Sequence, residues 1–323
     1  MKLTSLQISC VGLLLLISST TYAEPATKPV VSPGERATAV RPRPRGLPAG
    51  ATMELDLKYG SVAGRGQLLD LYLPEAADAS SPLIVWVHGG GWIEGDKRDC
   101  PAIGMVARGY AVASLNYRLS TEAIFPAQIQ DCKGAIRWLR AHSEKYKLDK
   151  HRFGAWGASA GGHLVALLGT GGDAKEIEGD IGGNLDQSSN VQCVIDWFGP
   201  TDLSVFFEQA NKGMNVFKGD PDRSPITVLF GGVMRDHMDL VRLANPITFI
   251  KKTTPPFLIM HGDKDPVVPL GQSEILAEAL KKNDVDVTFE VLEGAGHGNG
   301  FDRPTILPLM MQFMDKHLKR DRQ

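Results

Sequence analysis

The 323-residue sequence contains little cysteine and no excess of either charge. Four cysteines are too few for a disulfide framework, and a chain of this length can bury enough surface to form a core without one. With 35 lysines and arginines against 37 aspartates and glutamates, the chain lacks the basic field that holds a nucleic acid, so no such partner is expected. No His, Cys and carboxylate cluster has metal-ligand spacing, and we expect neither a metal nor another cofactor.

Long apolar runs are also missing from the N-terminal segment. The run at 11–17 is far shorter than the about 20 residues that a spanning helix needs, so no membrane span is expected. Lys2 precedes this run and small residues ending in Ala23 follow it, which is the pattern of a signal peptide cleaved after Ala23. We therefore predict a signal peptide over 1–23 and a secreted or periplasmic protein.

The predicted mature chain begins with a segment that has almost nothing to bury. Residues 24–50 are rich in proline and arginine and are expected to form a flexible arm before a single folded domain at 51–323. Cys100, Cys132 and Cys193 remain after cleavage, an odd number that allows at most one disulfide. Cys132 and Cys193 fall in apolar patterns and are interpreted as buried hydrophobes, so the sequence favours no disulfide without deciding the question.

From residue 53 onward the chain alternates strand-like and helix-like segments. Strands are predicted at 53–57, 67–73, 83–87, 110–116, 152–156, 191–198, 257–260 and 285–291, and helices at 129–142, 160–168, 272–282 and 307–318. Two strands followed by repeated strand–helix units predict an α/β protein with a mainly parallel sheet. Residues 171–190 and 201–243 interrupt the alternation, and we expect the first to be a loop and the second a cap over the site.

The motif GASAG at 157–161 lies between a predicted strand and a predicted helix. G-x-S-x-G in this context holds the serine hydroxyl exposed on a sharp turn, so Ser159 is the candidate nucleophile. The helix that follows directs its first N–H groups toward negative charge developing beside Ser159. The N–H of Ala160 is therefore expected to form part of an oxyanion hole.

A second glycine-rich segment, HGGGW at 88–92, follows the predicted strand 83–87. Glycines let backbone N–H groups approach a substrate oxygen without obstruction, and the N–H groups of Gly90 and Gly91 are expected to complete the oxyanion hole. No Lys-Ser/Thr pair follows, which disfavours a phosphate loop. Trp92 is expected to line the substrate pocket and narrow it.

A base and an acid for Ser159 come from two later segments. His297 lies in GAGHG at 294–298 and Asp265 in HGDKDPVVP at 261–269, and both segments follow predicted strands at the edge where parallel sheets bind ligands. The order Ser159, Asp265, His297 is the nucleophile, acid and histidine order of α/β-hydrolases. Asp263 is the rival acid, and Asp265 is preferred because it lies farther along the loop, where it can turn back toward His297.

These motifs, with NYRL at 116–119 and GPTDL at 199–203, resemble those of α/β-hydrolase serine esterases close to the hormone-sensitive-lipase-like and bacterial feruloyl and acetylxylan esterase group. The resemblance covers residue 51 to the end of the sequence. It implies an α/β-hydrolase fold with a mainly parallel eight-stranded sheet flanked by helices, and a small cap insertion. It also implies a carboxylic ester hydrolase that acts through an acyl-enzyme on small-molecule or polysaccharide substrates such as short-acyl, sugar or hydroxycinnamoyl esters.

Other functions on this fold stay open at this point: a prolyl-type peptidase, an arylformamidase, or a non-catalytic binding protein. The intact set of nucleophile, acid and base argues against the last of these. The charge density of the cap segment favours a hydrated rim over a lipid-facing lid, and hence short acyl groups. Charged residues of this segment include Glu208, Lys212, Lys218, Asp220, Asp222, Arg223, Arg235, Asp236 and Asp239. Neither the natural ester nor the oligomeric state follows from the sequence.

Overall fold

The computed structural model describes residues 41–75, 80–212, 222 and 224–319. Its compact unit begins at Pro44, before the predicted domain start at residue 51. The end of the predicted arm, 44–50, therefore belongs to this unit, because Leu47 is buried in the hydrophobic core. The predicted signal peptide and residues 24–40 of the predicted arm lie outside the described residues.

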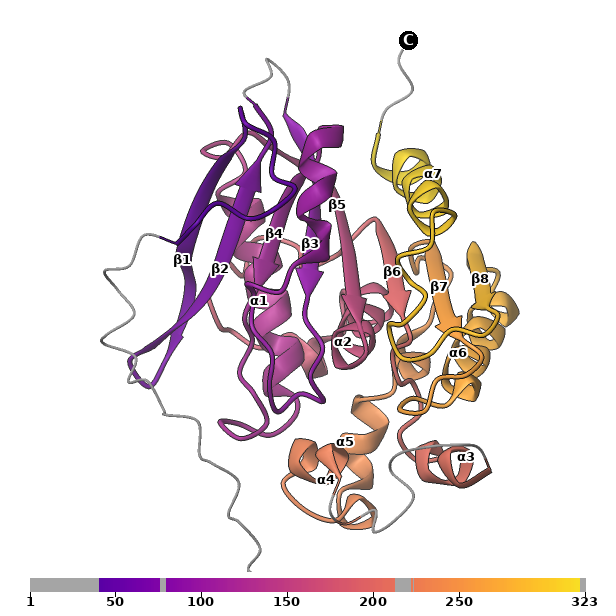
Figure 1. The fold of residues 1–323 in the computed structure, drawn as a ribbon. Helices are drawn as coiled ribbons and strands as arrows, with labels where there is room; N and C mark the ends of the chain where they lie inside the picture. Colours follow the sequence, from indigo (N-terminus) through magenta and orange to yellow (C-terminus); the bar gives the residue numbers. More distant parts are fainter. Residues whose placement is uncertain (1–40, 76–79, 213–221, 223, 320–323) are drawn as a thin grey trace, which may run out of the picture. The chain divides into compact units, whose positions relative to one another are not determined.

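A single eight-stranded sheet, with strand order β1-β2-β4-β3-β5-β6-β7-β8, forms the centre of this unit (Figure 1). The strands are β1 (Thr52–Val62), β2 (Arg65–Leu73), β3 (Ser81–Val87), β4 (Ala111–Leu115), β5 (Leu148–Ala158), β6 (Cys193–Trp197), β7 (Phe257–Gly262) and β8 (Val287–Leu292). Pairing is antiparallel between β1, β2 and β4 and parallel everywhere else. This arrangement confirms the predicted α/β-hydrolase fold with a mainly parallel sheet.

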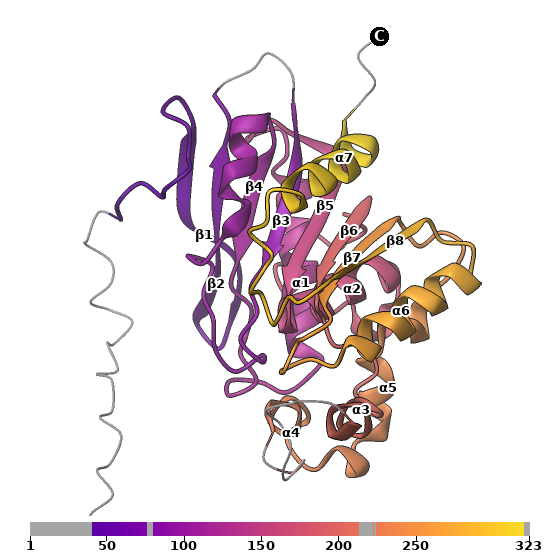
Figure 2. The same ribbon diagram turned by 45° about the vertical axis from the view of Figure 1, so that its right-hand side comes forward.

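Both faces of the sheet are covered, which explains why its central strands are continuous apolar runs. In β3, Leu83, Val85 and Val87 face one core, and Ile84 and Trp86 face the other. Helices α1 (Ala127–Ala141), α2 (Ala160–Thr170) and α6 (Leu270–Lys282) pack on the first face, and η2 (Pro101–Arg108) and α7 (Ile306–Leu318) on the second (Figure 2). None of the described helices is long and apolar enough to cross a bilayer.

The sequence pattern did not predict the 3₁₀ helix η2 (Pro101–Arg108). Pro101 at its start fixes a helical φ, and Gly109 ends it in the left-handed region with φ of 83°. Its apolar side covers β2 and β4, where Ala102, Met105 and Val106 are buried. Only eight residues long, it offers too few turns for helical periodicity to stand out in the sequence.

The described cysteines are all free. Cys132 in α1 and Cys193 in β6 are buried, as expected for small hydrophobes, and burial raises the pKa of both thiols. Cys100 is partly exposed at the start of η2. The folded unit therefore relies on packing and polar contacts rather than on covalent cross-links.

An insertion between β6 and β7 forms the predicted small cap at the carboxyl ends of the parallel strands (Figure 1). It contains α3 (Phe206–Lys212), α4 (Pro225–Phe230), η5 (Met234–Asp236) and α5 (Met238–Leu243), and η6 (Pro246–Phe249) leads back to the sheet. Ser224 caps α4 by accepting a hydrogen bond from the Thr227 N–H, and Gly231 ends the helix with φ of 72°.

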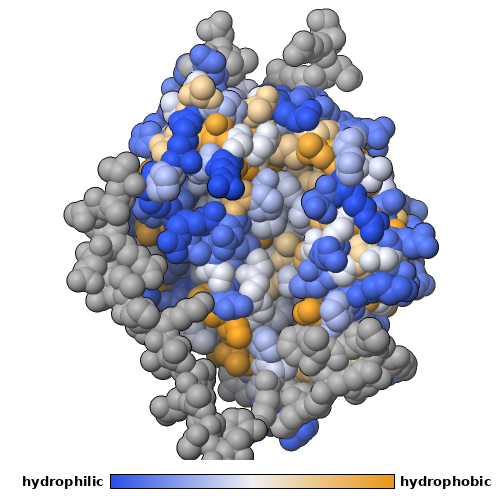
Figure 3. All heavy atoms as spheres, in the orientation of Figure 1, coloured by the Kyte–Doolittle hydropathy of each residue, from blue (hydrophilic) through white to orange (hydrophobic). Residues whose placement is uncertain are grey.

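Five of the charged residues that the sequence analysis named in the cap are described with their side chains. Glu208, Asp222, Arg235, Asp236 and Asp239 are all exposed, as a hydrated rim requires. The side chains of Lys212, Lys218, Asp220 and Arg223 lie outside the described residues. The face shown in Figure 3 mixes hydrophilic residues with small, separate apolar patches.

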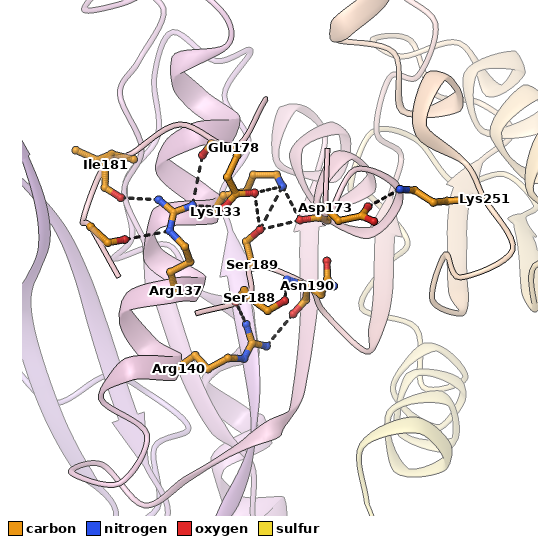
Figure 4. Close-up of polar contacts among 12 residues, drawn as sticks. Lys133, Arg137, Arg140, Asp173, Glu178, Ile181, Ser188, Ser189, Asn190 and Lys251 are labelled. Atoms are coloured by element: carbon orange, nitrogen blue, oxygen red, sulfur yellow. Dashed lines mark hydrogen bonds and ion pairs between the residues drawn. The ribbon is translucent and has the colours of Figure 1, made fainter. Parts of the chain in front are cut away.

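The predicted loop 171–190, apart from the short η3 (Lys175–Ile177), has no regular structure and is held against α1 by buried cations (Figure 4). Lys133, Arg137 and Arg140 follow one side of α1 and donate to backbone carbonyls of the loop. Lys133 and Arg137 also share the carboxylate of Glu178, with 2.7 Å between Lys133 Nζ and Glu178 Oε2. The side chains of these two cations are only 0% and 1% exposed, so Glu178 is the carboxylate that balances their charge.

We predict that Glu178→Gln lowers the free energy of unfolding by about 3 kcal/mol at neutral pH, because two buried cations lose their counter-charge. Burial alone would raise the pKa of Glu178, but hydrogen bonds and charge from Lys133, Ser189 and Arg137 lower it. The stabilisation is therefore present at neutral pH and is lost as the pH falls below about 4.5. Urea denaturation at pH 7 and pH 4 measures both effects.

The matched control is Glu176→Gln in the same loop, where the side chain is exposed. Its unfolding free energy should stay within about 0.5 kcal/mol of the wild-type value. Equal stabilities of the two variants at pH 7 would show that Glu178 does not anchor the loop.

Candidate active site

Ser159 lies on the turn between β5 and α2, in a strained backbone conformation with φ of 57°. Its N–H donates to the Trp197 carbonyl of the neighbouring strand, at 2.8 Å. The flanking glycines allow this turn: a Cβ on Gly157 would lie 2.3 Å from the Gly161 carbonyl oxygen, and one on Gly161 would lie 2.1 Å from the Val87 oxygen. Both distances are prohibitive, so the GxSxG pattern is a steric requirement of the turn.

The structure brings Ser159, His297 and Asp265 into one hydrogen-bonded chain from the loops after β5, β8 and β7. His297 Nδ1 lies 2.7 Å from Asp265 Oδ2, and His297 Nε2 lies 3.0 Å from Ser159 Oγ. An ionised carboxylate can only accept, so Nδ1 carries the proton and Nε2 is left to accept from the Ser159 hydroxyl. This tautomer is the one that can remove a proton from the serine.

The carboxylate of Asp265 is buried but surrounded by donors. Its Oδ1 accepts from the N–H groups of Val267 and Val268, at 2.7 and 2.9 Å. Its Oδ2 lies 3.4 Å from Nε2 of buried His261, in addition to the bond from His297. Burial raises the pKa of Asp265, but the bonds from His261, His297 and Val267 outweigh it and hold the pKa well below the usual range. Asp265 is therefore ionised across the pH range in which histidine titrates.

Asp263 occupies a different place. Its Oδ1 accepts from the N–H of Gly294, at 2.6 Å, and its Oδ2 lies 3.0 Å from Lys264 Nζ. The side chain therefore ties the loop after β7 to the loop after β8 from the solvent side. Of the two candidate acids, Asp265 is the one hydrogen-bonded to His297.

Gly90, Gly91 and Ala160 line the same pocket as Ser159. Gly90 and Gly91 have φ of 105° and 58°, and a Cβ on Gly90 would lie 2.3 Å from the Glu94 carbonyl oxygen. Among the described residues, no protein acceptor takes the N–H of Gly90 or Gly91. Ala160 is the first residue of α2, where N–H groups have no partner within the helix. The arrangement can stabilise a negatively charged oxygen.

The pocket has a volume of about 330 Å³ and a largely apolar lining. Apolar side chains come from Trp92, Ile93, Pro200, Phe206, Pro225, Ile226, Val267 and Val268, and polar ones from Ser159, His297, Glu94 and Ser224. Trp92 lines the pocket as predicted, but it is only 3% exposed and packs edge-on against His163. The sequence predicted neither the cap residues of this pocket nor Glu94. No sequence signal shows which part of an insertion folds back over the site, and Glu94 lies just after the HGGGW motif without being part of it.

The buried histidines have structural contacts. His88 Nδ1 lies 2.8 Å from the Gly89 carbonyl oxygen and its ring stacks on Tyr117. His163 Nε2 lies 2.6 Å from the Ala244 oxygen, and burial lowers the pKa of this imidazole to about 4. In the described part of the chain, no group of three or more His, Cys, Asp or Glu residues could hold a metal ion.

A Ser-His-Asp chain beside free N–H groups, at the carboxyl ends of the strands of this sheet, defines an α/β-hydrolase with a serine-centred site. The chain belongs to the BD-FAE family, whose model matches residues 69–280. It is similar to Esterase LipC of Mycobacterium tuberculosis, with 29% identity over 242 residues, which cover 72% of this chain and 57% of LipC. The chain thus spans little more than half the length of this relative.

Solved structures show the same likeness. A truncated form of a carbohydrate esterase from gut microbiota superposes with a TM-score of 0.73 and 32% identity, covering 83% of this chain and 97% of that one. A bifunctional GH43-CE protein of Bacteroides eggerthii superposes with a TM-score of 0.74 and 35% identity, covering 82% of this chain and 38% of that one. The predicted resemblance to α/β-hydrolase esterases is thereby confirmed.

The geometry predicts which carboxylate makes Ser159 reactive. Asp265→Asn should slow covalent labelling of Ser159 by a fluorophosphonate at least about 100-fold, because the amide no longer stabilises the correct tautomer and charge of His297. Asp263→Asn should change the rate less than about 3-fold, since Asp263 has no contact with His297. Labelling rates of the two variants, followed by mass spectrometry, decide which carboxylate acts on His297. A slower rate for Asp263→Asn than for Asp265→Asn would contradict the assignment of Asp265.

Proposed function

We propose that the protein is a secreted carboxylic ester hydrolase that cleaves short-acyl, sugar or hydroxycinnamoyl esters through an acyl-enzyme on Ser159. The observation that supports it most directly is the chain of hydrogen bonds from Asp265 through His297 to Ser159, beside the free N–H groups of the same pocket.

The proposed reaction begins when Ser159 Oγ attacks the ester carbonyl carbon and its proton passes to His297 Nε2. Asp265 stabilises the imidazolium, and the N–H groups of Gly90, Gly91 and Ala160 hold the oxyanion. The bond to the alcohol then breaks, and the alcohol leaves with the proton from His297. A water molecule attacks the acyl-enzyme with His297 as base, which releases the acid and restores the serine.

Two lines of support favour esters over the alternatives. The named relatives are an esterase, a carbohydrate esterase and a bifunctional protein with a CE part. The pocket is apolar and small, near the lower end of the size range of ligand sites, which suits a compact acyl group. The intact hydrogen-bonded chain argues against a purely binding protein.

We expect Ser159→Ala to lower hydrolysis of 4-nitrophenyl acetate by at least about 1,000-fold while the protein stays folded, because Ser159 Oγ lies at a partly exposed turn. A panel of N-formylkynurenine and aminoacyl anilides, assayed beside the ester, tests the arylformamidase and peptidase alternatives. Wild-type ester turnover in a folded Ser159→Ala variant would overturn the proposal, and faster turnover of an amide substrate than of any ester would favour an alternative.

Acyl length gives a further test of the pocket. Acetyl to butyryl aryl esters should have a kcat/KM about ten-fold or more above that of esters with ten or more acyl carbons, measured below the micelle concentration. Trp92→Ala should raise the relative rate on bulkier acyl groups, because removing the indole enlarges the pocket. Since Trp92 is also packed in the core, Trp92→Phe serves as the control that keeps an aromatic ring against His163. Equal kcat/KM values for short and long chains would refute the narrow pocket.

A further inference from the structure

The pocket beside Ser159 contains one acidic side chain. Of the described residues that line it, only Glu94 and His297 carry titratable groups, and the rest are apolar, glycine, alanine or serine. A like charge on a ligand beside this carboxylate would be repelled, and a hydrogen-bond donor would be attracted. The role of Glu94 is therefore not explained by the hydrogen-bonded chain of Ser159, His297 and Asp265.

Glu94 is held close to the oxyanion glycines. Its N–H donates to the Gly90 carbonyl at 3.1 Å, which closes a tight turn. A Cβ on Gly90 would lie 3.1 Å from Glu94 Cγ, so the Glu94 side chain starts in contact with this glycine. The turn thus fixes the base of the side chain at the edge of the pocket next to Ser159.

The carboxylate of Glu94 has no partner among the residues that the structure describes. In the described part of the chain, its carboxylate makes no hydrogen bond or ion pair, and the residue is exposed. Two residues further along, Asp96 is bonded to Arg98, so the same loop supplies a cation to one carboxylate and none to the other. The negative charge of Glu94 is therefore directed at solvent or at whatever occupies the pocket.

We propose that Glu94 is a specificity residue that excludes esters with a carboxylate near the scissile bond and admits neutral ones. The inference rests on the proposed ester hydrolysis. A carboxylate on the substrate would meet a like charge over an apolar surface, where repulsion is stronger than in bulk water. Neutral sugar hydroxyls can instead donate to Glu94. The substrate class is therefore esters of neutral sugars or phenols, and uronic acids that are acylated on a hydroxyl and keep a free carboxylate are excluded.

The test compares esters that differ only by an amide in place of a carboxylate. On the alcohol side these are 4-acetoxybenzamide and 4-acetoxybenzoate, and on the acyl side methyl glutaramate and monomethyl glutarate. Wild-type kcat/KM should favour the amide member of at least one pair about 5-fold or more. Glu94→Gln should reduce that ratio at least 3-fold, and this comparison of ratios cancels the intrinsic reactivities of the esters.

A control variant and a change of salt complete the experiment. Glu290→Gln removes an exposed carboxylate on β8, outside the pocket, and should leave both ratios at the wild-type values. Raising the salt from 0.05 to 0.5 M should weaken the wild-type preference, because exposed charges are screened. If Glu94→Gln leaves the amide-to-carboxylate ratio of kcat/KM unchanged in both pairs, the proposed role of Glu94 is wrong. Failure of the folded wild type to hydrolyse either neutral ester would instead overturn the proposed ester hydrolysis.

Discussion

The site depends on one steric constraint, which is the close approach of the start of α2 to the carboxyl ends of the neighbouring strands β3, β5 and β6. Ser159 has a positive φ at this crossing, and neighbouring backbones approach so closely that Gly157, Gly161 and Gly162 have no room for a Cβ. The strain of the turn is balanced by strand pairing and by the apolar core on both faces of the sheet. The same geometry exposes Ser159 Oγ and brings the first N–H of α2 beside it.

Buried polar groups gather where the parallel strands end, because strand ends leave backbone N–H and carbonyl groups unpaired. Asp265 accepts two such N–H groups, and Asp196 at the end of β6 accepts the Gly199 N–H at 2.9 Å. The pKa values of the two carboxyl groups are shifted in opposite directions: donors hold the pKa of Asp265 well below the usual range, whereas burial raises the pKa of Asp196 to about 6. Asp265 is thus the carboxylate suited to stabilise a histidine cation.

The cap closes the site without making it a lipid groove. Phe206, Pro225 and Ile226 complete an apolar pocket, while the charged side chains of the cap that the structure describes face solvent. Glu94 lies at the edge of the same pocket, on the loop that supplies the oxyanion glycines. Rate and selectivity can therefore be set by neighbouring residues of one short turn, the glycines through their N–H groups and Glu94 through its charge.

Local patterns were enough to predict the strands of the sheet and the helices that cover it, because hydrophobic periodicity follows burial. They were also enough to predict the turn at Ser159 and the chain order of the site, because a serine between two glycines marks a turn with no room for side chains. Other features depend on segments far apart in the chain. Asp263 contacts Gly294 and Asp265 contacts His297 only after β7 and β8 have paired. Three further features depend on contacts between distant segments, which no local pattern encodes. They are the inclusion of residues 44–50 in the folded unit, the packing of η2 on the sheet and the ion pairs of Glu178 with α1.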